Sequence, residues 1–398
     1  MNFSDLTSKF GMVWYAVTSD SDLVSGNGYF VDASLVSSLT LTLPISPSVG
    51  DRIVVVDSAN VFGSKSVFVG RNGSNICGCD SNVLLVDNGS LFNFVYLNAV
   101  YGWSIIGHYD SRFGFPGFNY GYDAGYNDLT TIDKFSFNTD GNSVGIGNLS
   151  INRTLQAGQS SRNYGYTSGG NTGTYSNVID KFSFSADGDS VDVGDLTVAR
   201  DRISGQSSSI YGYTSGGSDG SVVNIIDKFS FSTDGNAIDV GNLTINNYYT
   251  AGSSSYDYGY VTGGLGGSSI LINRFSFASD GNAVNVGTLN AGNQYHIGQS
   301  SYTHGYLSGG NFVTILSRIQ KFSFASSNTS ATIGDLTVAR YVGSGQSSIN
   351  YGYTCGGTYS GGSNINVIDK FSFISDGNAT DVGDLSTARH GNKGGVQY

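Results

Sequence analysis

Few residues of this sequence have the types and spacing that catalysis or metal binding requires. The four histidines lie far apart and show no metal-ligand spacing; they are His108, His296, His304 and His390. No Gly-x-Ser-x-Gly nucleophile elbow stands between a strand and a helix. All 30 acidic residues are aspartate, so glycoside hydrolysis by paired carboxylates would need aspartates that meet across a surface. The pattern predicts a protein without catalytic residues, metal site or cofactor.

Charged residues recur at fixed positions of a repeat, which favours structural pairing. The arginines at one such position are Arg153, Arg200, Arg340 and Arg389, and a set of arginines that binds a carboxylate is the alternative. The aspartates at another position each precede a lysine; they are Asp133, Asp180, Asp227 and Asp369. We interpret these aspartates as members of ion pairs at the edge of a repeat or between repeats. Further Asp-Gly pairs are typical of hairpin turns, and they offer too few carboxylates for a calcium loop.

The repeat itself is the strongest pattern in the sequence. A Tyr-Gly-Tyr element recurs with its glycine at Gly121, Gly165, Gly212, Gly259, Gly305 and Gly352. A Phe-Ser-Phe element keeps the same spacing, and it starts at Phe135, Phe182, Phe229, Phe275, Phe322 and Phe371. Helix formers are sparse, whereas Ser, Thr, Tyr, Phe, Val and Asn abound. Six copies of an all-β unit of about 47 residues predict a six-bladed β-propeller.

Each repeat reads as four strands: the Gly-Gln-Ser-Ser segment, YGYTSGG, IDKFSF and SVDVGDL. Rings on one face of a strand and Gly or Ser on the other predict an aromatic core between blades. A stacking platform for sugars is the alternative role of these rings. Ring closure needs one more strand, for which residues 394–398 and residues 113–118 are both candidates.

The candidate binding surface follows from the order of the strands. Antiparallel strands place the second-to-third loops and the fourth-to-first crossovers on one face of a propeller. These segments differ between copies, whereas the Asp-Gly turns of the other face are nearly uniform, so the variable face is the candidate for ligand binding. Loop drift without function is the alternative. The candidate residues are Tyr126, Asn127, Tyr175, Asp201, Arg202, Asp219, Tyr248, Tyr249, Tyr295, His296, Asn311, Phe312, Tyr341 and Tyr359.

Composition and charge limit the partners of the chain. The net charge is −11, and no basic stripe exists, which argues against nucleic acid. The three cysteines, two of them in a tight Cys-Gly-Cys, form no disulfide framework. The first residues lack the pattern of a signal peptide, and no apolar run reaches the length that spans a bilayer.

The sequence before the repeats divides into three parts. Residues 1–20 match no repeat and suit an attachment arm. Residues 21–107 hold strand runs such as LTLTLP and RIVVVD, separated by Asn and Gly clusters, which predict a β-sandwich or short barrel. Residues 108–118 form a linker, and the predicted propeller occupies residues 119–398.

Two resemblances point to a family of proteins. The segments LPISPSVGD, RNGSNI and YLNAVYGW, within about residues 35–106, resemble a module of bacteriophage tail-fibre and other virion proteins. The matching residues are Leu43, Pro44, Pro47, Gly50, Asp51, Arg71, Asn72, Gly73, Ser74, Asn75, Ile76, Tyr96, Gly102 and Trp103. The paired glycines that end YGYTSGG resemble the kelch double glycine. The YGYTSGG…DKFSF repeats as a whole resemble those of virion proteins of marine phages.

These resemblances imply a virion appendage on the tail or capsid surface. The N-terminal region would contact other virion proteins and form a homotrimer, and the propeller would adsorb to a host-surface glycan or another receptor. A purely structural head or tail decoration protein is the first alternative, and a glycan-degrading propeller enzyme is the second.

Overall fold

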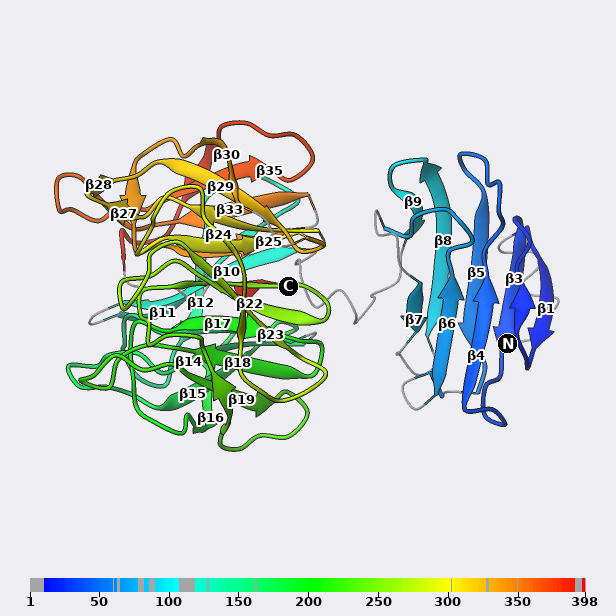
Figure 1. The fold of residues 1–398 in the computed structure, drawn as a ribbon, viewed down its shortest axis with the longest axis horizontal. Helices are drawn as coiled ribbons and strands as arrows, with labels where there is room; N and C mark the ends of the chain where they lie inside the picture. The colour runs from blue at the N-terminus through cyan, green and yellow to red at the C-terminus, as the bar shows by residue number, and fades with distance from the viewer. Residues whose placement is uncertain are drawn as a thin grey trace. The chain divides into compact units, whose positions relative to one another are not determined.

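The computed structural model describes residues 11–59, 61–62, 65–77, 82–85, 90–106, 119–126, 129–161, 163–301, 303–326, 329–348, 350–390 and 396–397. The chain divides into two compact units, residues 1–112 and 113–398, whose strands are labelled in Figure 1. Every regular element among the described residues is a strand. No helix in this part of the chain is therefore long and apolar enough to cross a membrane. The prediction of an all-β protein is confirmed.

The first unit contains two sheets, and the first six strands of the chain alternate between them. The five-stranded sheet has the order β1 (Val13–Val17), β3 (Asn27–Val31), β5 (Arg52–Asp57), β8 (Leu91–Asn98) and β9 (Gly102–Ile105). The four-stranded sheet has the order β2 (Ser21–Asp22), β4 (Ser38–Thr42), β6 (Ser66–Gly70) and β7 (Val83–Leu85). The pairs β1–β3, β3–β5, β2–β4 and β4–β6 are parallel. The sequence pattern did not predict this parallel pairing.

One hydrophobic core joins the two sheets of this unit. Leu41 of β4, Val55 of β5 and Phe94 of β8 belong to the same buried cluster, and Trp103 of β9 is completely buried within it. The alternating pattern of LTLTLP accounts for this, because its leucines are buried and its threonines only partly so. A strand that alternates in this way can cover a core with one face only.

The second unit is a propeller of six four-stranded blades, which confirms the predicted number. The blades are, in inner-to-outer order, β37 (Val396–Gln397), β10 (Tyr120–Tyr126), β11 (Leu129–Ser136), β12 (Val144–Asn148); β13 (Ala157–Ser160), β14 (Tyr164–Ser168), β15 (Val178–Ser183), β16 (Val191–Asp195); β17 (Ser204–Ser207), β18 (Tyr211–Ser215), β19 (Ile225–Ser230), β20 (Ile238–Asn242); β21 (Ala251–Ser254), β22 (Tyr258–Thr262), β23 (Leu271–Ser276), β24 (Val284–Thr288); β25 (Ile297–Ser300), β26 (His304–Ser308), β29 (Arg318–Ser323), β30 (Ala331–Asp335); and β32 (Ser344–Ser347), β33 (Tyr351–Cys355), β35 (Val367–Ser372), β36 (Thr380–Asp384). They are numbered blades 1 to 6 below. Four short strands lie in the connections: β27 (Asn311–Phe312), β28 (Thr314–Ile315), β31 (Arg340–Tyr341) and β34 (Thr358–Tyr359).

The C-terminal segment closes the ring. Strand β37 pairs antiparallel with β10, with Tyr122 opposite Val396. Residues from the end of the chain therefore supply the inner strand of blade 1, as one of the two closure hypotheses expected. The competing segment, residues 113–118, lies outside the described residues.

Aromatic rings pack between neighbouring blades, as the repeat predicted. Tyr166 of blade 2 stacks on Phe231 of blade 3 with ring centroids 4.8 Å apart, and Phe229 lies at 5.5 Å. Glycine is required between the two tyrosines of the element, because a Cβ on Gly165 would lie 2.3 Å from the Phe182 ring of the same blade. The blade interfaces are also polar near the axis, where Gln159 donates from Nε2 to the Tyr213 carbonyl at 3.0 Å.

Candidate binding site

The crossovers and the second-to-third loops meet on one face of the propeller. In blade 3, Asp201 and Ser218 exchange two backbone hydrogen bonds of 3.0 Å each. In blade 2, Thr154 and Asn171 do the same at 3.0 and 2.8 Å. In blade 6 the crossover strand β31 pairs with β34 of the loop. The two sets of variable segments that the sequence indicated are therefore joined within each of these blades.

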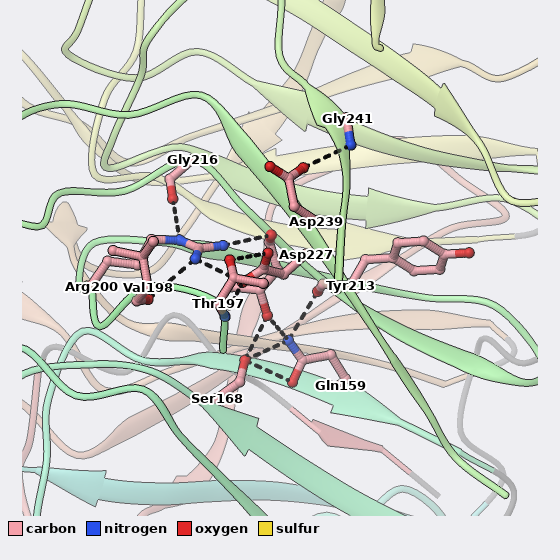
Figure 2. A network of polar contacts seen from close by, with 11 residues as sticks. Gln159, Ser168, Thr197, Val198, Arg200, Tyr213, Gly216, Asp227, Asp239 and Gly241 are labelled. Carbon is pink, nitrogen blue, oxygen red and sulfur yellow. Dashed lines mark hydrogen bonds and ion pairs between the residues drawn. The ribbon is translucent and has the colours of Figure 1, made fainter. Parts of the chain in front are cut away.

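A buried ion pair fixes the crossover that enters blade 3 (Figure 2). Arg200 donates from Nη1 to Asp227 Oδ2 at 2.8 Å, and both side chains are completely buried. The hydroxyl of Thr197 donates to the same carboxylate at 2.6 Å, and Arg200 Nε donates to the Gly216 carbonyl at 3.0 Å. These bonds hold the crossover against the second and third strands of its blade, so the residues that follow Arg200 have a defined position.

Five blades share a left-handed backbone two residues after the position of Arg200 in the repeat. The φ angles are between 55° and 60° at the five equivalent positions, Leu155, Arg202, Tyr249, Tyr295 and Val342. In blades 3 to 6 the amide of this residue donates to the carbonyl of its counterpart in the preceding blade, so four bonds of 2.9 to 3.1 Å link the five residues. These five residues form a continuous chain of hydrogen bonds across blades 2 to 6, and we call them the crossover ring.

The crossover ring keeps one costly backbone conformation in five blades. A left-handed conformation costs an L-residue with a Cβ roughly 1–2 kcal/mol relative to glycine. Five copies nevertheless hold side chains as different as Leu, Arg, Tyr and Val at this position. The backbone is constant while the side chain varies. The side chains in blades 2 to 5 are partly exposed, whereas Val342 of blade 6 is buried.

Aromatic side chains of the crossover ring and its neighbours form a connected cluster. The rings of Tyr249 and Tyr295 have centroids 4.0 Å apart, and Tyr248 lies 5.2 Å from Tyr249. Tyr341 meets Tyr295 edge-on at 5.8 Å. All four tyrosines are partly exposed. Such rings can stack on the apolar face of a sugar while their hydroxyls form hydrogen bonds.

Arg202 adds a positive group to this cluster. Its Nε donates to the Tyr249 hydroxyl at 2.6 Å, and its Nη1 donates to Asp201 Oδ1 at 2.7 Å. Asp201 is completely buried and also accepts from Asn171 Nδ2 at 2.9 Å, whereas the Arg202 side chain is 27% exposed. Burial raises the pKa of Asp201. Burial opposes the charge of Arg202, but its bonds to Tyr249 and Asp201 raise its pKa on balance. The pair therefore directs its positive end toward solvent.

Other predicted site residues lie apart from this cluster or below the surface. The sequence analysis expected His296 on the surface, and this prediction is wrong. His296 is completely buried and contacts the Thr262 hydroxyl at 3.1 Å. Asp201 is buried as well, and it acts through Arg202. Tyr175 (37% exposed) is the exception, because its side chain hydrogen-bonds that of Arg202 and so joins the cluster. The remaining residues lie around the face: Asp219 (exposed), Asn311, Phe312 (43% exposed) and Tyr359. Asn127 lies outside the described residues.

Tyr126 belongs to a separate contact at the seam between blades 1 and 6. Asn364 donates from Nδ2 to the Tyr126 hydroxyl at 2.8 Å, and His390 Nδ1 lies 2.6 Å from Asn364 Oδ1. The rings of Tyr126 and His390 have centroids 4.8 Å apart. Burial lowers the pKa of His390. The sequence analysis did not select Asn364 or His390 for the site.

The sequence analysis also did not name Leu155 and Val342 of the crossover ring among the candidate residues. Alignment of the repeats places them at the position of Arg202, Tyr249 and Tyr295, so the signal was present in the spacing. It was not used because neither residue is polar or aromatic.

The described inner strands of the propeller enclose one small polar cavity. A cavity of about 40 Å³ lies among the inner strands of blades 2 to 6, lined by Gly, Gln and Ser such as Gln159 and Ser207. This volume suits about three water molecules. In the described part of the chain, no group of three or more His, Cys, Asp or Glu side chains is arranged to hold a metal ion.

Comparison with known proteins assigns neither a family nor a function to the chain. No protein-family model matches the chain, and no curated protein matches it significantly.

Proposed function

We propose that the chain is a bacteriophage virion appendage whose propeller adsorbs to a host-surface glycan or another receptor. The observation that carries the proposal is the crossover ring, where a costly backbone is kept constant and the side chains differ from blade to blade. The resemblance of residues 35–106 and of the repeats to virion proteins supplies the biological setting. The proposal includes no catalytic step.

The first unit is the attachment part in this proposal. It is a β-sandwich that contacts other virion proteins and trimerises, and the propeller is kelch-like. Support for the kelch-like type comes from the paired glycines, since Gly169 and Gly170 have φ angles of 59° and 109°. Three copies of the propeller on one appendage would multiply a weak affinity.

The experiment is adsorption of the labelled full-length chain to host cells and to a glycan array. The test variant carries Tyr249→Leu and Tyr295→Leu, because Leu155 already occupies the same backbone conformation in blade 2. The control is Tyr164→Leu, a tyrosine 36% exposed that belongs to the opposite, uniform face. We expect the double variant to lose adsorption and the control to keep it.

Two results would reject the proposal. One is a folded chain that adsorbs to no host cell and no glycan. The other is a double variant that adsorbs as well as the parent chain, which would remove the tyrosines of the crossover ring from the binding site.

A further inference from the structure

Arg202 is the only charged residue of the crossover ring, and its surroundings orient it. The Nε and Nη1 groups are engaged by Tyr249 at 2.6 Å and by Asp201 at 2.7 Å. An arginine side chain loses much rotational freedom when it is held at two points. Tyr175 also hydrogen-bonds the Arg202 side chain. The guanidinium is thus preorganised before any ligand arrives, and a ligand reaches it through the 27% of the side chain that is exposed.

The two members of the ion pair differ in exposure to solvent. Asp201 is completely buried, and the Arg202 side chain is 27% exposed. A ligand that approaches from solvent therefore meets the cation first, on a protein whose net charge is −11. The field of the whole chain opposes a densely charged phosphate polymer, so binding of an anion has to come from close contacts at Arg202, as with a saccharide that places one carboxylate there.

The neighbouring rings define the rest of the ligand. Tyr249 accepts the Arg202 bond, and the Tyr295 ring lies 4.0 Å from it, with Tyr341 beyond. A neutral sugar that stacked here would replace the water on the guanidinium with bonds to uncharged hydroxyl oxygens only. A sugar with a ring carboxylate would replace them with charge-assisted bonds, which are the stronger kind.

We infer that the site selects a saccharide that carries a carboxylate, with Arg202 binding the carboxylate and the tyrosines of the crossover ring stacking on the sugar ring. This inference deepens the proposed receptor function and rests on it. Arg202 is the specificity-determining residue, and Asp201 positions it.

The test measures binding of the full-length chain to oligogalacturonate, oligoguluronate and polysialic acid, each beside its methyl-esterified form. The esters keep the sugar ring and remove the charge. The variants are Arg202→Leu, which copies Leu155 of blade 2, and Arg202→Lys, which keeps the charge without the planar fork. A thermal melt of each variant shows that it is folded.

We expect at least one free acid to bind more tightly than its ester, by about tenfold or more, as one charge-assisted bond provides. Arg202→Leu should remove this preference, so that acid and ester bind alike, and added salt should weaken binding of the free acid to the parent chain. Comparison of the uronates with polysialic acid then identifies the source of the carboxylate.

Two outcomes would overturn the inference. The first is equal binding of acid and ester, or a preference that survives in folded Arg202→Leu. The second is adsorption to host cells without binding to any of the three acids, which leaves the receptor function intact and removes the acidic ligand. Absence of all adsorption would reject both, so the two failures are distinguishable.

Discussion

The buried arginine–aspartate pairs show how one residue constrains another in this repeat. Four blades bury such a pair at 2.8 or 2.9 Å: Arg153–Asp180, Arg200–Asp227, Arg340–Asp369 and Arg389–Asp133. Blade 4 has Asn247 and Asn273 at these two positions, and blade 5 has Asn293 and Gln320. Charge is therefore lost from both positions together. This agrees with the high cost of a buried charge without its partner, and with the modest net value of a complete pair.

We predict that Asp227→Asn destabilises the propeller by about 3–5 kcal/mol, because it leaves Arg200 charged and completely buried. The double change Arg200→Asn with Asp227→Asn copies blade 4 and should recover most of this loss. Denaturant unfolding of the two variants and the parent chain measures the difference. If the double variant is no more stable than Asp227→Asn, the cost of an unpaired buried charge does not explain why blades 4 and 5 lack both charges.

The position of His296 illustrates why a residue type alone did not define the site. The sequence analysis placed it on the surface beside Tyr295. The structure shows that the residue after each crossover-ring position turns inward, so that Gln156, Ile203, Thr250 and His296 are all completely or almost completely buried. The left-handed residue reverses the direction of the chain here, and no residue type in the repeat signals this reversal. The variable segments were predicted from sequence, but the direction of their side chains was not.

At the scale of the element, the Asp-Gly turns do more than reverse the chain. Asp234 in the turn of blade 3 pairs with Lys181 of blade 2 at 2.8 Å. Asn236 of the same turn accepts from the Asp195 amide of blade 2 at 3.1 Å. Each such turn thus connects its blade to the preceding one. The strands and turns could be predicted because their signals are local, whereas these partners are 53 and 41 residues apart and depend on how the blades stack.

We predict that Lys228→Met, which removes the equivalent pair with Asp280, lowers stability by less than about 1 kcal/mol. The two groups are 2.6 Å apart, but the Asp280 side chain is 51% exposed, so water and salt screen the pair. The loss should shrink further when unfolding is measured in high salt. A cost near that of Asp227→Asn would contradict the assignment of the buried pairs as the stronger connections.

At the scale of the whole molecule, closure of the ring depends on a short segment at the end of the chain. Val396 is 1% exposed and packs with Tyr122 and Phe182 across the interface between blades 1 and 2. The preceding crossover is fixed by Arg389, whose Nη2 lies 2.8 Å from Asp133 Oδ2 on β11. The six-fold repeat predicted the number of blades, but the sequence left two segments as candidates for the closing strand. Only the pairing of β37 with β10 decides between them.

We predict that deletion of residues 394–398 lowers the melting temperature of the propeller by at least about 5 °C. The deletion removes burial of Val396, worth about 1.5–3 kcal/mol, and leaves β10 as an unpaired inner edge, and a propeller-sized unit loses about 2–4 °C for each kcal/mol. Removal of Tyr398 alone is the control, because it leaves β37 intact. Calorimetry of the full-length chain should show the shift in one transition and not in the transition of residues 1–112. An unchanged melt after the larger deletion would mean that the hydrogen bonds between blades, such as those of Gln159 and of the crossover ring, hold the ring closed without its last strand.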